Sequence, residues 1–208
     1  MVGIVDYSAG NIRSVERALG SLGAPYMLVK NPRDARTADR LIFPGVGEAR
    51  YAMEQLRRTG LDSFLRDWAE AGRPLLGICL GSQIIFEHSE EGDVECLGLL
   101  RGSIRRFTGV WGDNGVAAGL KVPHMGWNDL TFTNGGTRLF DGVPERSDFY
   151  FVHSYVMQPA DASIVRATAD YGCAFPACVE SGSVTAFQFH PEKSGRAGLR
   201  LLENFVSC

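Results

Sequence analysis

The apolar run Pro74-Leu-Leu-Gly-Ile78, which Gly72 precedes, restricts the possible fold more than any other stretch of this sequence. A short apolar run bounded by a glycine and a proline is typical of a parallel strand that is covered on both faces. Residues 84–88 are predicted to form a helix. The chain must therefore turn sharply from strand to helix within Gly77-Ile-Cys-Leu-Gly81.

Cys79 stands at the centre of this turn, with a glycine two residues before it and another two residues after it. Glycines at this spacing allow neighbouring backbone to approach a strained turn closely. A helix N-terminus favours the thiolate form of a cysteine and leaves backbone N–H groups free to bind an oxyanion. The turn predicts a nucleophilic cysteine, although a small core cysteine at a strand end fits this pentapeptide equally well.

A second chemical motif is Phe187-Gln-Phe-His-Pro-Glu192. Residues 184–189 are predicted to form a strand that ends at His190, and Pro191 is expected to keep the chain extended there. Residues two apart in an extended chain point the same way, so Glu192 is expected beside the imidazole, where it would hold one tautomer. Together the pair would supply the base and its orienting group for a cysteine nucleophile.

Strands and helices alternate in the first half of the chain. Strands are expected at 2–6, 26–29, 40–43 and 74–78, and helices at 11–22, 48–56 and 61–71. After residue 93 strands and turns follow one another, with strands expected at 97–107, 129–132, 149–156, 164–168 and 177–189, Asn-Gly turns at 114–115 and 134–135, and a last helix over 194–205. This order predicts one α/β domain over residues 1–208. Its mixed, mostly parallel sheet would be flanked by helices, carry an antiparallel extension, and bind ligands at the carboxyl ends of the parallel strands.

Composition excludes several classes of protein. With 208 residues, 45% of them hydrophobic, the chain can bury the core of one domain. The net charge of −3 with dispersed basic residues argues against a nucleic-acid partner. The sequence has neither a secretory signal nor an apolar run near the membrane-spanning length, and its five cysteines lack zinc-ligand spacing. We therefore expect a cytoplasmic protein with reduced thiols, without a membrane or metal partner; Cys173 and Cys178 would bridge only in an oxidising compartment.

Two motifs together, Gly77-Ile-Cys-Leu-Gly-Ser-Gln83 and Phe189-His-Pro-Glu192, resemble the class I, or triad, glutamine amidotransferases. Four further sequence motifs are similar to those of one branch of this family, the glutaminase subunits of imidazole glycerol phosphate synthase. They are Pro44-Gly-Val-Gly47, Val122-Pro-His-Met-Gly-Trp-Asn128, Tyr150-Phe-Val-His-Ser-Tyr155 and Glu192-Lys-Ser194. The resemblance extends over essentially the whole chain. Ser82 departs from it, since a methionine is usual there in this branch.

The resemblance implies a flavodoxin-like fold and a Cys79-His190-Glu192 triad that hydrolyses glutamine to glutamate and ammonia without a cofactor. It implies that the ammonia passes to a cyclase subunit, which makes imidazole glycerol phosphate and aminoimidazole carboxamide ribotide in histidine biosynthesis. It assigns oxyanion-binding amides to Val46 and Leu80, substrate binding to Gly47, Gln83, Glu91, Ser154 and Tyr155, and the partner face of a heterodimer to Asn11, Trp127, Asn128, Tyr150 and Lys193.

Some alternatives stay open. Residues 124–128 are expected to form a loop in which Trp127 either anchors a partner or packs beneath the loop. His153 competes with His190 as the base, but no Pro-Glu pair follows it. The chain as a whole would also suit a stand-alone cysteine hydrolase, a non-catalytic assembly subunit, or a paralogous amidotransferase that serves another acceptor such as a surface sugar.

Overall fold

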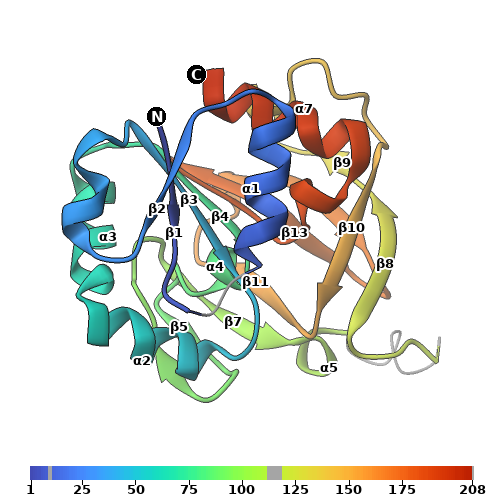
Figure 1. Cartoon of the computed structure of the whole chain (residues 1–208). Coiled ribbons are helices and arrows are strands. Elements are labelled where there is room, and N and C mark those ends of the chain that lie inside the picture. Colours follow the sequence, from blue (N-terminus) through green and yellow to red (C-terminus); the bar gives the residue numbers. More distant parts are fainter. Residues whose placement is uncertain (9–10, 112–118, 208) are drawn as a thin grey trace.

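The computed structural model describes residues 1–8, 11–111 and 119–207. Its main sheet has eight strands (Figure 1). In spatial order they are β2 (Tyr26–Val29), β1 (Val2–Val5), β3 (Arg40–Gly45), β4 (Leu75–Cys79), β14 (Val184–Phe187), β13 (Ala174–Ser181), β12 (Val165–Asp170) and β9 (Thr131–Phe132). Pairing is parallel from β2 through β14 and antiparallel from β14 through β9. The mixed, mostly parallel sheet with an antiparallel extension is therefore confirmed.

β4 is the central buried strand that the sequence predicts, and all of its residues are buried. Successive residues of a strand face opposite sides of a sheet. Leu76 and Ile78 accordingly pack in one core with α1 (Ile12–Ser21) and α7 (Gly195–Ser207). Leu75 packs in the other core with α2 (Ala49–Thr59) and α3 (Leu61–Glu70). Helices thus cover both faces of the sheet, as expected (Figure 1).

In the second half of the chain, two predicted strands pair outside the main sheet and one predicted loop is a strand. Residues 97–107 and 149–156 are not part of the main sheet. Instead, β11 (Tyr155–Pro159), β7 (Gly102–Arg106), β5 (His88–Ser89) and β6 (Val94–Glu95) form a four-stranded sheet, and β10 (Asp148–His153) pairs with β8 (His124–Asp129) in a two-stranded one. The predicted loop at 124–128 is wrong because this segment is β8. Local sequence indicates extended chain, but pairing depends on distant partners.

The predicted helix at 84–88 is also wrong. The helix that follows β4, α4 (Leu80–Gln83), ends before this segment. The carbonyl oxygens of Ile84, Ile85 and Phe86 accept hydrogen bonds from backbone N–H groups of residues 97–100. These bonds replace the helical ones, and they hold 97–100 out of the strand that was expected to begin there.

Two further observations complete the fold. A turn lies at Asn134-Gly135 as predicted, where both residues have positive φ, whereas the predicted turn at 114–115 falls outside the described residues. Across residues 1–8, 11–111 and 119–207, none of the helices combines the length and apolar character that crossing a membrane requires.

Candidate active site

Cys79 occupies a strained backbone conformation where β4 meets α4. Its φ of 56° and ψ of −114° are sparsely populated by residues other than glycine, and such strain concentrates at functional sites. The flanking glycines make the turn possible. A Cβ atom on Gly81 would lie 1.9 Å from the Phe43 carbonyl oxygen, and one on Gly77 would lie 3.0 Å from the Gly81 carbonyl oxygen. The sharp strand-to-helix turn predicted from the glycine spacing is confirmed.

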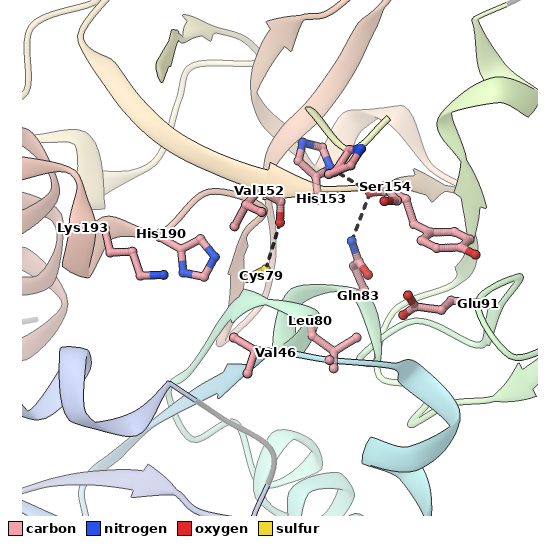
Figure 2. Close-up of a pocket in the computed structure, with 13 residues that line it drawn as sticks. Val46, Cys79, Leu80, Gln83, Glu91, Val152, His153, Ser154, His190 and Lys193 are labelled. Atoms are coloured by element: carbon pink, nitrogen blue, oxygen red, sulfur yellow. Dashed lines mark hydrogen bonds between the residues drawn. The ribbon is translucent and has the colours of Figure 1, made fainter. Parts of the chain in front are cut away.

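The cysteine opens into a cavity of about 290 Å³. Its lining includes most of the predicted site residues, namely Val46, Gly47, Cys79, Leu80, Gln83, Glu91, Ser154, Tyr155, His190 and Lys193. Pro123, Val152 and His153 also line it. Figure 2 shows His190 on one side of Cys79, and Gln83 and Glu91 on the other. The cavity lies where β3, β4 and β14 end, at the carboxyl edge of the parallel strands.

Glu192 orients the His190 ring through its Nδ1 atom. The Nδ1 atom of His190 lies 2.8 Å from Glu192 Oε1, and the two side chains are only 2% and 1% exposed. The predicted contact is present, but the predicted reason was wrong. Residues Pro191–Lys193 form a turn of 3₁₀ helix rather than an extended segment, and this turn brings the carboxylate back to the ring. Because Nδ1 is held by Glu192, Nε2 is the nitrogen that remains for chemistry, and no hydrogen-bond partner lies within the usual distance of it among the described residues.

The charge state of His190 follows from its neighbours. Burial lowers the pKa of His190, but the negative charge of Cys79 and the Glu192 carboxylate raise it more, so that the pKa is about 9. His190 is therefore an imidazolium at neutral pH when the cysteine is a thiolate. In its thiol form, Cys79 donates a hydrogen bond from Sγ to the carbonyl oxygen of Val152 at 3.8 Å, a contact that the sequence did not predict (Figure 2).

The raised pKa of His190 predicts a pH profile. Turnover of glutamine, the expected substrate, should stay level until the pH approaches about 9 and fall above it, as His190 loses the proton that it is expected to donate. In Glu192→Gln the hydrogen bond can remain but the charge is lost, so the alkaline limb should move to lower pH and kcat should drop roughly 10²-fold. Glutamate release across pH measures both. A limb that stays in place in the variant would contradict the role of Glu192.

His153 is already occupied by other partners. Its Nδ1 lies 2.8 Å from the Tyr155 carbonyl oxygen and its Nε2 lies 3.0 Å from Nδ1 of His124. Burial, the largest cause, lowers the pKa of His153 to about 3. Since both nitrogens have partners, the geometry favours His190 over His153 as the base.

Polar groups of the cavity suit the amino-acid end of a substrate. Gln83 is 4% exposed and not on a solvated helix surface, and its Nε2 donates to the Tyr155 carbonyl oxygen at 3.0 Å and to Gln188 Oε1 at 2.9 Å. Glu91 Oε2 accepts a hydrogen bond from the Ala49 amide at 3.0 Å. Burial raises the pKa of Glu91. A substrate ammonium group beside this carboxylate would favour its charged form.

The two predicted oxyanion amides belong to neighbouring chain segments. Leu80 begins α4, where backbone N–H groups lack helical partners. Val46 directly follows β3, whose last residue Gly45 is paired in register with Cys79. A Cβ atom on Gly45 would lie 2.7 Å from the Gly81 nitrogen, so these segments are in close contact beside the cysteine. Their role as oxyanion donors stays a prediction.

The predicted partner residues are only partly gathered on one face. Trp127 is 58% exposed, pairs in register with Tyr150, and has its ring centroid 6.0 Å from that of Tyr150. Lys193 Nζ lies 5.8 Å from the Tyr150 ring centroid and also lines the cavity. Met125, two residues before Trp127 on the same side of β8, is 62% exposed. It was not predicted as an interface residue, because only a strand, and not the expected loop, places residues 125 and 127 on one side.

Asn128 and Asn11 do not join this exposed face in the same way. Asn128 follows Trp127 in β8 and so points to the opposite side of the strand, where its Nδ2 donates to the Asp170 carbonyl oxygen at 2.7 Å. Asn11 stands before α1 and its side chain accepts a hydrogen bond from the Ser14 hydroxyl at 3.0 Å, without capping a backbone N–H group. Both side chains therefore have partners within the chain.

No group of three or more His, Cys, Asp or Glu side chains in the described ranges is arranged to hold a metal ion. A nucleophilic cysteine on a strained turn, facing a histidine held by a glutamate, defines a cysteine-dependent transferase or hydrolase of the triad type. The family model described as "Glutamine amidotransferase class-I" matches residues 3–208, so the chain belongs to that family.

Two curated relatives indicate to which branch of the family this chain belongs. The imidazole glycerol phosphate synthase subunit HisH of Nitratidesulfovibrio vulgaris is 47% identical over 205 residues, covering 99% of this chain and 95% of that protein. The HisH subunit of Geobacillus kaustophilus is 48% identical over 207 residues, covering 99% and 96%. At this identity and coverage the chain is a member of the HisH branch of the family.

Solved structures agree on the fold. A crystal structure of a glutamine amidotransferase has a TM-score of 0.74 at 23% identity, covering 99% of this chain and 97% of that one. PurLQS from Thermotoga maritima has a TM-score of 0.73 at 22% identity, with the same coverage. At such low identity these likenesses show the fold alone.

Proposed function

We propose that this chain hydrolyses glutamine to glutamate and ammonia and passes the ammonia to a cyclase subunit. The observation that carries the proposal is the arrangement of Cys79, His190 and Glu192. The cysteine lies on a strained turn, the histidine has one free nitrogen beside it, and the glutamate holds the other nitrogen at 2.8 Å.

The chemistry follows from this geometry. The Cys79 thiolate attacks the carboxamide carbon of glutamine, and His190 gives its proton to the nitrogen that leaves as ammonia. The neutral His190 then takes a proton from water, which cleaves the glutamyl thioester and regenerates the thiol. The amides of Val46 and Leu80 hold the negative oxygen of each tetrahedral intermediate. One glutamine and one water give one glutamate and one ammonia.

The rest of the cavity selects an α-amino acid. Glu91 offers a carboxylate to the substrate ammonium group, and Gln83, Gly47, Ser154 and Tyr155 line the same cavity and would contact the amino-acid end of the substrate. These groups distinguish free glutamine from a peptide, whose backbone nitrogen carries no charge. A stand-alone cysteine hydrolase that acts on peptides is therefore less well supported.

The partner follows from the fate of ammonia and from the exposed apolar face. Ammonia in bulk water at neutral pH is mostly protonated and then no longer nucleophilic, so a sealed path to a synthase is required. Met125 and Trp127 expose a large apolar surface next to Tyr150, and Lys193 links this surface to the cavity. Large exposed aromatic side chains are common anchors of protein interfaces.

The relatives named as subunits of imidazole glycerol phosphate synthase suggest which synthase this is. We propose a cyclase that closes the imidazole ring, releasing imidazole glycerol phosphate and aminoimidazole carboxamide ribotide in histidine biosynthesis. A cytoplasmic location is part of the proposal.

Glutamate release by the purified chain, alone and mixed with the cyclase carrying its ribulosyl substrate, tests the function. If the turn at Val46 becomes competent only in the loaded complex, stimulation by the loaded partner should be at least about tenfold. Trp127→Ala should lose this stimulation while remaining folded. High activity of the free chain with no stimulation would instead favour an independent hydrolase or another acceptor.

A further inference from the structure

Two buried histidines, His124 and His153, have no part in the mechanism above. His124 lies between aromatic rings, with centroid distances of 4.1 Å to Tyr171 and 5.0 Å to Phe151, both stacked. His153 lies 4.9 Å from the ring centroid of Phe107 and lines the cavity. Packing alone would not require imidazole at either position, since phenylalanine would fill the same space.

Hydrogen bonds set the tautomer of both rings from one end. The Tyr155 carbonyl oxygen can only accept, so the Nδ1 atom of His153, 2.8 Å away, must carry the hydrogen. In neutral His153 the Nε2 atom is then an acceptor. It lies 3.0 Å from Nδ1 of His124, which must donate to it. His124 is thereby left with an accepting Nε2.

Asn128, at the other end of this series of hydrogen bonds, requires the same donor-to-acceptor direction. Asn128 Oδ1 accepts from the Asp129 amide at 2.9 Å, and its Nδ2 donates to the Asp170 carbonyl oxygen at 2.7 Å. The Asn128 amide therefore cannot flip. Its Nδ2 also lies 3.4 Å from Nε2 of His124 and presents an N–H to that accepting atom. Both ends thus require the same pair of Nδ1–H tautomers.

The series of hydrogen bonds from Asn128 through His124 and His153 ends at the substrate cavity. The Tyr155 carbonyl oxygen that receives the His153 hydrogen also receives one from Gln83 Nε2 at 3.0 Å. The second Nε2 hydrogen of Gln83 goes to Gln188 Oε1 at 2.9 Å. The amide of Gln83 is therefore oriented, and its Oε1 is left as an acceptor. In Figure 2 this oxygen lies on the side of Gln83 that faces Glu91.

We propose that His124 and His153 are positioning residues that hold the Tyr155 carbonyl in place, so that Gln83 presents an acceptor oxygen beside Glu91 to the ammonium group of the substrate amino acid. This inference rests on the proposed glutaminase function. Burial in the aromatic cluster lowers the pKa of His124 to about 4 and that of His153 to about 3, which keeps both rings neutral and the bond direction constant at working pH.

Two variants of His124 separate positioning from packing. His124→Leu fills the space but removes the donor to His153, and should raise the KM for glutamine by about tenfold with a smaller change in kcat. In His124→Asn the amide can donate from the place of Nδ1, so the KM should stay within about twofold of the wild-type value. His88→Asn, at a histidine whose Nε2 pairs with Asp93, is the matched control and should be unchanged.

Kinetics are measured in the complex with the loaded cyclase, and circular dichroism of each variant together with its co-elution with the cyclase in size-exclusion chromatography shows that it is folded and assembled. An unchanged KM in His124→Leu, or equal losses in the Leu and Asn variants, would overturn the proposal. Nitrogen-15 NMR of the free wild-type chain adds a test that needs no turnover. Both rings should be neutral Nδ1–H tautomers, and an Nε2–H form of either one would overturn the inference even if the glutaminase function stands.

Discussion

Replacement of Cys79 by alanine should abolish glutamine-dependent synthesis by the complex while leaving synthesis from ammonium salts intact. The thiolate is the only group in the proposed mechanism that forms a covalent bond to substrate, so its loss should lower glutamine turnover by about 10⁴-fold or more. Added ammonia bypasses the glutaminase and reaches the cyclase directly. The ratio of the two rates in one preparation gives the measurement.

A matched control is available among the other thiols. Cys173 is a free cysteine that does not line the cavity, and Cys173→Ala should leave both rates unchanged. If Cys79→Ala lost ammonium-dependent synthesis as well, the division of labour between the two subunits would be wrong. If it kept glutamine-dependent synthesis, the nucleophile would be wrong.

Gly81→Ala should be the most destabilising single methyl addition near the site. The added Cβ would lie 1.9 Å from the Phe43 carbonyl oxygen, which is backbone and cannot move without shifting β3 against α4. Such overpacking costs about 3 kcal/mol or more and would displace the turn that carries Cys79. Urea unfolding should show the loss of stability, and glutaminase activity should be lost even below the transition.

Gly20→Ala is the comparison for that variant. Gly20 lies in α1, and a Cβ atom there would meet nothing within 4 Å. Alanine is favoured over glycine in a helix, so this variant should be neutral or more stable by up to about 1 kcal/mol. Equal unfolding midpoints for the two variants would show that the close contact at Gly81 is not what restricts this position.

The same contact explains why a cysteine tolerates its strained backbone. A residue at positive φ of this kind costs on the order of 1–3 kcal/mol and persists only where its surroundings hold it. Here β3 and β4 pair up to Gly45 and Cys79, and α4 packs directly against the Phe43 carbonyl. The rigid sheet therefore supplies the energy that keeps the thiol aimed into the cavity.

Local features of the site were predictable from sequence. The glycine spacing around Cys79 and the closeness of Glu192 to His190 depend on residues within a few positions of each other, and short-range geometry decides them. Even there the predicted backbone conformation was wrong, because a 3₁₀ turn rather than an extended chain brings Glu192 to the His190 ring. The parallel half of the sheet was also predictable, since buried strands that alternate with amphipathic helices have few ways to pack.

The sequence by itself determined the class of chemistry, the family and the central sheet. Each of these depends on short, contiguous patterns, namely the motifs around Cys79 and His190 and the alternation of buried strands with amphipathic helices. Only the tertiary structure decided how the later strands divide into separate sheets, why residues 84–86 leave the helix, and which histidine has a free nitrogen. It also brought Asn128, His124 and His153 into one chain of hydrogen bonds that ends at Gln83. These outcomes depend on pairing between segments far apart in sequence, for which local pattern carries no signal.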